Sequence, residues 1–228
     1  MSLAIESRVI GDVAVLDCAG RIVEGDESAE LETRVNALLL RHPYIVLDLR
    51  GVAFIDSLGL GLILRLRGFA RAAAGDVKLS APNQHIREVL RVTKLTGVLP
   101  PYESDSEAVA AFYSPAEAGD DRVSLEIDVL CVHPSADVLA YARELLKQAG
   151  YGVTTAANLS DARVLLHATT PPVLVIGPEW QQKLAALDDG ELAVRVGVVP
   201  WPADFSKEDP GDAARQLLAD VSKVLAGT

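Results

Sequence analysis

Hydrophobic and polar residues follow two kinds of spacing along the chain. One kind predicts strands and the other predicts helices. Short apolar runs or alternations are typical of strands, whereas apolar residues three or four positions apart mark one face of a helix. In the first half, apolar runs predict strands at about residues 3–10, 13–19, 44–49, 77–80 and 96–100. Helical spacing predicts helices at about 26–40, 57–74, 82–92 and 104–112. Strands that alternate with helices favour an α/β fold with a mixed sheet and helices packed against it.

The second half shows a more regular alternation. Apolar runs predict strands at about residues 127–132, 153–156, 173–176 and 193–199. Helical spacing predicts helices at about 136–149, 159–167, 181–188 and 213–225. A strand–helix unit repeated about four times predicts a parallel sheet with helices on both faces.

The segment from Ile45 to Ala70 has the most distinctive pattern. The run from Ile45 to Leu49 predicts a buried strand, and residues 50–55 look turn-like. A helix then follows, because apolar residues recur at helical spacing at Leu58, Leu62, Leu66 and Phe69. Serine is a favoured N-cap, since its oxygen accepts a hydrogen bond from a free N–H of the first turn. Ser57 is therefore expected at the start of this helix, with its hydroxyl outside.

This position suits a regulatory phosphate. The first turn of a helix presents unpaired N–H groups and a partial positive charge, which favour an anion. A phosphate on Ser57 would add about −1.5 to −2 charge beside Asp56, where a docked partner would meet it. The alternative is that Ser57 only caps the helix.

Two further pairs on this helix have open interpretations. Gly59 and Gly61 each weaken a helix by about 1 kcal/mol relative to alanine. Close approach of a backbone, from the adjoining strand or from a partner, would explain them. Arg67 and Arg71 are four residues apart and lie on one side, so they could accept a phosphate or an acidic partner, or form a solvated face.

Phe-Ile-Asp-Ser-x-Gly-Leu-Gly at residues 54–61, after the Val-Leu-Asp-Leu strand, resembles the signature of STAS domains, the family of bacterial anti-sigma-factor antagonists. The resemblance covers residues 1–113 and implies that Ser57 is phosphorylated by a partner-switching kinase. It implies a partner-binding surface at six residues: Asp56, Ser57, Leu58, Gly59, Leu60 and Gly61. Leu58 departs from the family pattern, which has a second hydroxyl residue there.

The second half, residues 124–228, resembles the receiver domain of two-component response regulators, a flavodoxin-like parallel α/β fold. The acidic residues with which a receiver binds magnesium and accepts a phosphoryl group are missing. The first strand ends in Val132-His133-Pro134, where a receiver has acidic magnesium ligands, and Gly177 occupies the place of the phosphorylated aspartate. Without these carboxylates a hard cation has no ligands. We therefore expect a degenerate receiver-like domain without phosphotransfer.

Composition narrows the function classes. The chain has 228 residues, of which 50% are hydrophobic, and its net charge is −11. This acidic balance argues against nucleic acid or an anionic membrane as a general partner. Residues 1–113 carry a net −3 and residues 114–228 a net −8. The small, polar, acidic stretch 114–123 has the composition of a linker and predicts the domain boundary.

Other features predict a cytoplasmic protein without a cofactor. Cys18 and Cys131 lie in separate apparent strands and are expected to be buried thiols in a reducing compartment. The N-terminus does not have the pattern of a signal peptide, and no apolar run has the roughly 20 residues of a membrane span. Metal-ligand spacings, phosphate-binding loops and nucleophile elbows are absent from the sequence, so no metal, cofactor or enzymatic activity is expected.

Two hypotheses for function remain. In the first, unphosphorylated Ser57 leaves the helix end free to bind an anti-sigma factor or serine-protein kinase, and phosphorylation releases this partner. In the second, the chain is a non-catalytic scaffold or dimerisation protein of a bacterial signalling assembly, with a second copy of itself as a candidate partner, and Ser57 is only a cap.

Overall fold

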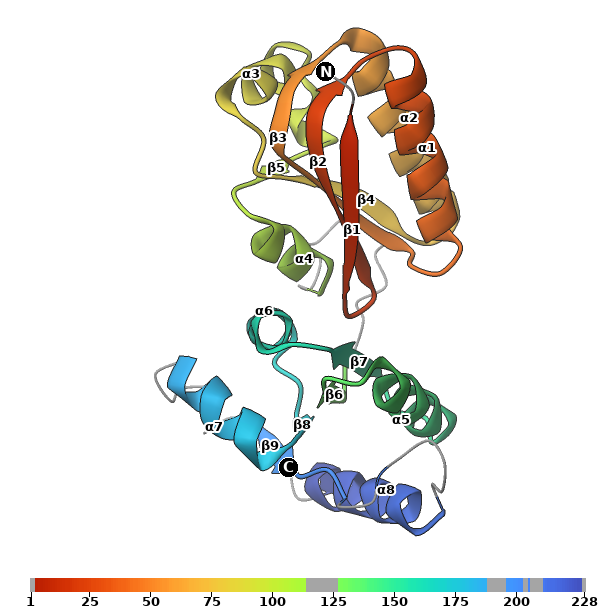
Figure 1. Cartoon of the computed structure of the whole chain (residues 1–228), viewed down its shortest axis with the longest axis vertical. Coiled ribbons are helices and arrows are strands. Elements are labelled where there is room, and N and C mark those ends of the chain that lie inside the picture. The colour runs from red at the N-terminus through yellow and green to blue at the C-terminus, as the bar shows by residue number, and fades with distance from the viewer. Residues whose placement is uncertain (1–2, 114–126, 188–195, 203–204, 206–210, 227–228) are drawn as a thin grey trace. The chain divides into compact units, whose positions relative to one another are not determined.

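The computed structural model describes residues 3–113, 127–187, 196–202, 205 and 211–226. The chain divides into two compact units, Met1–Phe112 and Tyr113–Thr228 (Figure 1). The expected linker, residues 114–123, lies outside the described residues. Each unit has its own sheet and its own hydrophobic core.

The N-terminal unit contains a mixed five-stranded sheet, as the pattern predicted. Its strands follow the chain in the order β1 (Ala4–Ile10), β2 (Val13–Ile22), β3 (Tyr44–Ile55), β4 (Asp76–Ser80) and β5 (Pro101–Tyr102). β1 and β2 are antiparallel, and each later pair is parallel. The β1–β2 turn is the Gly11-Asp12 pair, in which Gly11 has φ 61°, a left-handed conformation that glycine adopts without strain. The strand predicted at residues 96–100 is wrong, because a 3₁₀ turn occupies Leu95–Gly97 and β5 follows it.

β2 and β3 are longer than the sequence suggested. The turn expected at residues 50–55 is instead the second half of β3, which pairs with residues 19–22 of β2. Register shifts interrupt this ladder between Asp17 and Ala19 and again between Gly20 and Arg21. Gly51 lies so close to β2 that a Cβ there would be 2.8 Å from the Cys18 carbonyl oxygen. Glycine often marks the end of a strand. Here the glycines instead allow bulges within the paired strands β2 and β3.

Helices cover both faces of this sheet. α1 (Asp26–Leu39) and α2 (Ser57–Ala72) lie side by side on one face (Figure 1), where they bury Leu31, Leu62 and Leu66 against Leu47 and Leu16. α3 (Gln84–Val92) begins at Asn83, whose side chain accepts from the Ile86 N–H. α4 (Asp105–Tyr113) packs on the opposite face. Strand alternation turns Tyr44 and Asp48 towards that face, and the Tyr44 and Phe112 rings lie 5.0 Å apart.

The C-terminal unit contains a parallel sheet, as predicted. The strands are β6 (Val129–Val132), β7 (Val153–Ala156), β8 (Val173–Ile176) and β9 (Gly197–Val199), in the spatial order β7-β6-β8-β9. The helices are α5 (Ala136–Gln148), α6 (Leu159–Thr169), α7 (Pro178–Leu187) and α8 (Gly211–Ala226). The receiver-like nature of this unit stays a prediction.

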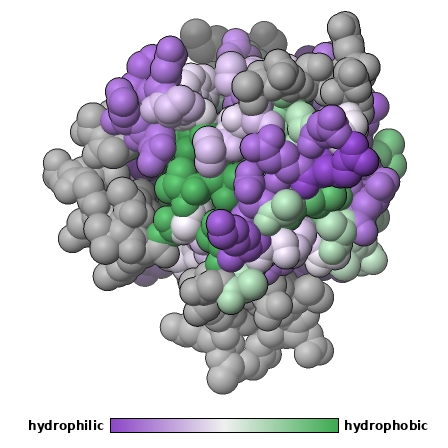
Figure 2. Space-filling view, turned by 90° about the horizontal axis from the view of Figure 1, so that it is seen from below, coloured by the Kyte–Doolittle hydropathy of each residue, from purple (hydrophilic) through white to green (hydrophobic). Residues whose placement is uncertain are grey.

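The described surface is a mixture of polar and apolar side chains. Figure 2 shows one face of the molecule, on which hydrophilic residues surround a small hydrophobic area. Such areas are normal, because apolar atoms form more than half of a typical protein surface. Within the described residues, no helix has the length and apolar character needed to cross a membrane.

Candidate functional site

Ser57 lies where β3 ends and α2 begins. It is the first residue of α2 and its side chain is exposed. The expectation that Ser57 itself caps the helix is wrong, because Asp56 is the N-cap. Asp56 has an extended backbone, and its Oδ1 accepts a hydrogen bond of 2.7 Å from the Gly59 N–H. Either residue type can cap a helix. The carboxylate takes this role, and the Ser57 hydroxyl is not needed for it.

Asp56 places a fixed negative charge beside that hydroxyl. Its Oδ2 also accepts from the backbone N–H of Glu24, at 3.2 Å. The Gly59 hydrogen bond is the main reason that the pKa of Asp56 lies below its ordinary value, and the Glu24 bond and the Arg21 charge act in the same direction. Asp56 is therefore ionised at neutral pH, so a phosphate on Ser57 would stand next to an existing carboxylate.

The motif glycines have different surroundings. A Cβ on Gly59 would lie 2.3 Å from the carbonyl oxygen of Ile22, the last residue of β2. The same carbonyl accepts from the Asp56 N–H, so β2 approaches the first turn of α2 closely. The adjoining strand thus explains Gly59. It does not explain Gly61, because a Cβ there would have no neighbour within 4 Å.

The six expected partner-binding residues divide between the surface and the interior. Ser57 and Leu58 are exposed, and Leu58 retains 53% of its accessible surface. Asp56 and Gly61 are half-buried, whereas Gly59 and Leu60 are buried. Leu58 and Phe69 recur at helical spacing with Leu62 and Leu66, but Leu58 lies outside, and so does Phe69, at 52% exposure. The inner face is formed by Leu60, Leu62, Ile63, Leu66 and Ala70.

A second group beside this site was missed from the sequence. The Phe54 ring is stacked on His85 at 5.8 Å, and the Arg21 guanidinium lies 5.4 Å from the Phe54 ring centre. Phe54 remains 38% exposed at the end of β3, two residues before Asp56. Aromatic and arginine side chains of this kind are enriched in binding hot spots. Only the parallel pairing of Arg21 with Phe54 brings them together, and that pairing depends on the unexpected extension of both strands.

Arg67 matches neither interpretation considered for the Arg67–Arg71 pair, whereas Arg71 is exposed on the helix surface. Arg67 forms a bidentate ion pair with Asp76, with Nε–Oδ1 and Nη2–Oδ2 distances of 2.7 and 3.2 Å. Arg71 lies 3.6 Å from the same carboxylate. The Asp76 side chain is 6% exposed, so these arginines balance a buried charge at the start of β4. The pair connects α2 to the sheet and is not a phosphate site.

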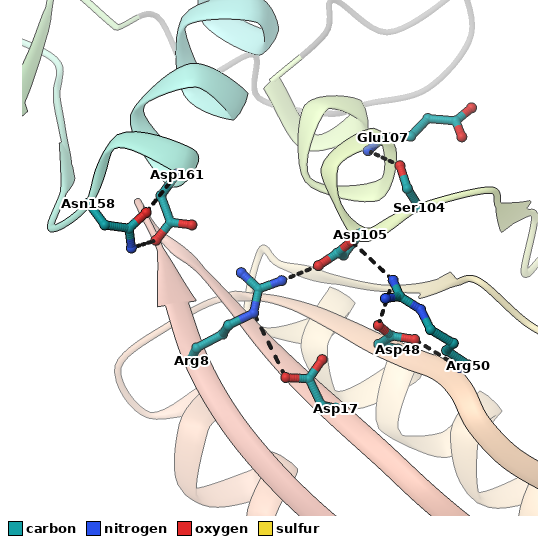
Figure 3. Close-up of polar contacts among 9 residues, drawn as sticks. All are labelled: Arg8, Asp17, Asp48, Arg50, Ser104, Asp105, Glu107, Asn158 and Asp161. Carbon is teal, nitrogen blue, oxygen red and sulfur yellow. Dashed lines mark hydrogen bonds and ion pairs between the residues drawn. The ribbon is translucent and has the colours of Figure 1, made fainter. Parts of the chain in front are cut away.

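The opposite face of the sheet holds a network of alternating charges (Figure 3). Arg8 joins Asp17 to Asp105 at the start of α4, and Arg50 joins Asp105 to Asp48. Burial is the main reason that the pKa of Asp17 is raised, and the Arg8 charge opposes this. A pocket of about 350 Å³ opens beside the network. The ion pairs attach α4 to the sheet. In the part of the chain that the structure describes, no three His, Cys, Asp or Glu side chains are grouped to hold a metal.

The carboxyl end of β6 in the C-terminal unit is packed with aromatic groups. The Trp201 indole N–H donates to the Val132 carbonyl at 2.9 Å, and its ring lies edge-on to His133 at 5.4 Å. Phe205 packs on Trp201 at 5.1 Å. Asp128 precedes the first residue of β6, at the other end of the strand, and accepts from the Gly152 N–H. This edge has the chemistry of a packed core.

Both cysteines are buried thiols without a disulfide, as expected. Burial raises the pKa of each to about 12. Cys18 and Cys131 are therefore poor nucleophiles at neutral pH.

Comparison with known proteins gives a family match for the N-terminal unit. Residues 4–108 match the family model for the STAS domain. This part of the chain is therefore similar to STAS domains. BtrV of Bordetella bronchiseptica, named as a candidate anti-sigma factor antagonist, is 28% identical over 102 residues, which are 44% of this chain and 88% of that protein.

The solved structures to which part of the chain is similar include two anti-sigma factor antagonists. A candidate antagonist from Thermotoga maritima has 25% identity and a TM-score of 0.44, and covers 47% of this chain and 92% of its own. Unphosphorylated SpoIIAA has 18% identity and a TM-score of 0.43, and covers 50% of this chain and all of its own. Each of these relatives corresponds to half of the present chain or less.

Proposed function

We propose that the STAS domain makes this protein an anti-sigma-factor antagonist that works by partner switching. Unphosphorylated Ser57 and its surroundings, Asp56 to Gly61, bind an anti-sigma factor that is also a serine kinase. Phosphorylation of Ser57 releases that partner. The observation that carries the proposal is the exposed Ser57 hydroxyl on the first residue of α2, beside an ionised Asp56.

The electrostatics of the site support a release step. A phosphate adds about −1.5 to −2 charge and must lose water if a docked partner covers it. A buried charge without a matching partner costs several kcal/mol, which is enough to dissociate a moderate complex. Within the unbound protein the same phosphate is tolerated, because the first turn of α2 stabilises an anion. The modification thus acts on the complex and leaves the fold intact.

The C-terminal unit supplies no chemistry for this cycle. We infer that it is a receiver-like domain that has lost phosphotransfer. The strand order β7-β6-β8-β9 corresponds to the order 2-1-3-4 of flavodoxin-like sheets and supports this inference. The aromatic contacts of Trp201 at the end of β6 also support it, since a magnesium site there would need carboxylates.

The switch is tested with a purified anti-sigma-factor serine kinase and Mg-ATP. We expect one phosphoryl group, located on Ser57 by peptide mass analysis and absent from Ser57→Ala. In a binding assay with that kinase and ADP, Ser57→Ala should bind like wild type and Ser57→Asp should lose at least tenfold in affinity. Asp56 caps α2, so neither variant removes the cap and both should keep the wild-type circular dichroism spectrum. If Ser57→Asp binds as tightly as wild type, the switch is wrong.

A further inference from the structure

The outward face of α2 carries few charges. Exposed surface helices normally carry polar residues on the side away from the core. Here that side contains Ser57, Leu58, Gly61, Leu64, Arg65, Gly68, Phe69 and Ala72. Leu58 and Phe69 are each about half exposed, at 53% and 52%. Arg65 is the one charged residue among them, and the exposed Arg71 lies at the edge of this face, 3.6 Å from Asp76. An exposed helix face with so few charges and so many apolar residues is typical of a contact surface.

Two glycines on this face have no internal explanation. A Cβ on Gly61 or on Gly68 would have no neighbour within 4 Å among the described residues. Glycine weakens a helix relative to alanine, so its use here needs another reason. The two are seven residues apart, which is nearly two turns, so they lie on the same side of α2. Small residues at this spacing allow another helix backbone to approach closely.

The pattern is symmetric about the middle of the helix. Gly61 and Gly68 are equally distant from the point between Leu64 and Arg65, whereas Leu58 is 6.5 positions and Phe69 4.5 positions from it. We propose that this face binds the same face of a second copy of the chain, with the two α2 helices antiparallel across a two-fold axis near Leu64 and Arg65. Each Gly61 then meets Gly68 of the second copy, and each Leu58 lies beside Phe69 of the second copy, offset by about 3 Å along the helix axis. A two-fold interface requires this self-complementarity.

The charges beside the face are also self-complementary. Arg65 lies 3.4 Å from Glu32 of the neighbouring α1, and both side chains are exposed. Across the two-fold axis, two arginines and two glutamates would alternate, so the like charges of the two Arg65 residues are compensated. A single helix pair is a small interface, so the dimer should be weak and reversible.

Dimerisation would cover Ser57. Ser57 lies on the outward face, and the symmetry places it opposite Ala72 of the second copy. Self-association would therefore compete with any enzyme or partner that needs Ser57. The dimer goes beyond the proposed function and does not depend on it, because its geometry involves no phosphate and no other protein.

Sedimentation equilibrium of the full chain tests the dimer itself. We expect concentration-dependent self-association of wild type and at least a tenfold larger dissociation constant for Gly68→Gln. The same substitution should raise the melting temperature at dilute concentration, because glutamine is a better helix former and its Cβ meets open space. Gly97→Gln is the matched control, since its Cβ also meets open space, and it should self-associate like wild type. A monomeric wild type, or a Gly68→Gln variant that associates equally well, would overturn the proposal.

Disulfide trapping tests the register. Arg65→Cys lies near the two-fold axis and should form a covalent dimer under mild oxidation. Leu58→Cys is similarly exposed, but its two copies would be about 20 Å apart along the helix axis, too far for a disulfide. Cys18 and Cys131 are buried and should not react. Equal crosslinking of the two variants would show a contact of another kind and contradict the antiparallel arrangement.

Discussion

At the scale of single residues, neighbouring positions in the STAS motif have separate tasks. Asp56 closes the helix end and supplies a fixed charge, Ser57 presents a hydroxyl to solvent, and Gly59 lets β2 approach. The cap and the modifiable group are therefore different side chains. Chemistry at Ser57 can change without loss of the hydrogen bond that starts α2.

Gly59 and Gly61 should respond oppositely to alanine. Gly59→Ala places a Cβ 2.3 Å from the Ile22 carbonyl oxygen, so β2 or α2 must shift. We expect a loss of about 1–3 kcal/mol in the free energy of unfolding, as is typical of overpacking. Gly61→Ala meets open space and should gain up to about 1 kcal/mol from helix propensity. Urea unfolding of both variants at dilute concentration measures the difference. A loss of similar size in Gly61→Ala would mean that the space beside it is not open.

At the scale of elements, α2 is attached to the sheet by one buried ion pair besides its apolar face. Arg67 contacts Asp76 through two short bonds, whereas Arg65 on the same helix contacts Glu32 at 3.4 Å in an exposed position. The two pairs share their chemistry and differ in burial. They therefore separate the contribution of a buried pair from that of a surface pair.

Arg67→Met should destabilise the N-terminal unit far more than Arg65→Met. Without Arg67, the buried Asp76 carboxylate keeps the Val77 N–H at 2.8 Å but only the more distant Arg71, at 3.6 Å, as a charged partner, so we expect a loss of about 3 kcal/mol. Arg65→Met removes an exposed pair and should change stability by less than about 1 kcal/mol. Chemical denaturation followed by far-UV circular dichroism compares the two. Equal losses would show that burial of Asp76 does not govern the energetics of this contact.

Sequence patterns predicted which helices and strands exist better than they predicted the residues at which these elements begin and end. Both sheets, and the α2 start within one residue, followed from apolar spacing and the Asp-Ser-x-Gly signature. The extension of β2 and β3 did not follow, because Gly20 and Gly51 normally signal a turn and here form bulges in a parallel ladder. The Arg21–Phe54–His85 group depends on that ladder and was missed with it. Asp56 and Ser57 are both good caps, so propensity alone could not assign the role.

At the scale of the whole molecule, the two units have separate hydrophobic cores, and their unfolding can be followed by different spectroscopic signals. The N-terminal core includes Leu66, and the C-terminal core includes Leu217. Both tryptophans, Trp180 and Trp201, belong to the C-terminal half. Tryptophan fluorescence therefore reports the C-terminal unit alone, whereas far-UV circular dichroism reports both units.

A core truncation in one unit should leave the transition of the other unchanged. Leu66→Ala in α2 and Leu217→Ala in α8 each empty a fully buried site, and each should cost its own unit about 2–5 kcal/mol. In urea, Leu217→Ala should move the fluorescence midpoint to lower denaturant. Leu66→Ala should leave the fluorescence midpoint unchanged. It should move the part of the circular dichroism transition that reports the N-terminal unit to lower denaturant. If Leu66→Ala shifts the fluorescence midpoint as far as Leu217→Ala does, the units unfold as one. The proposed Ser57 switch would then act on the stability of the C-terminal unit as well, because any charge or partner bound at α2 would be linked to the unfolding of both units.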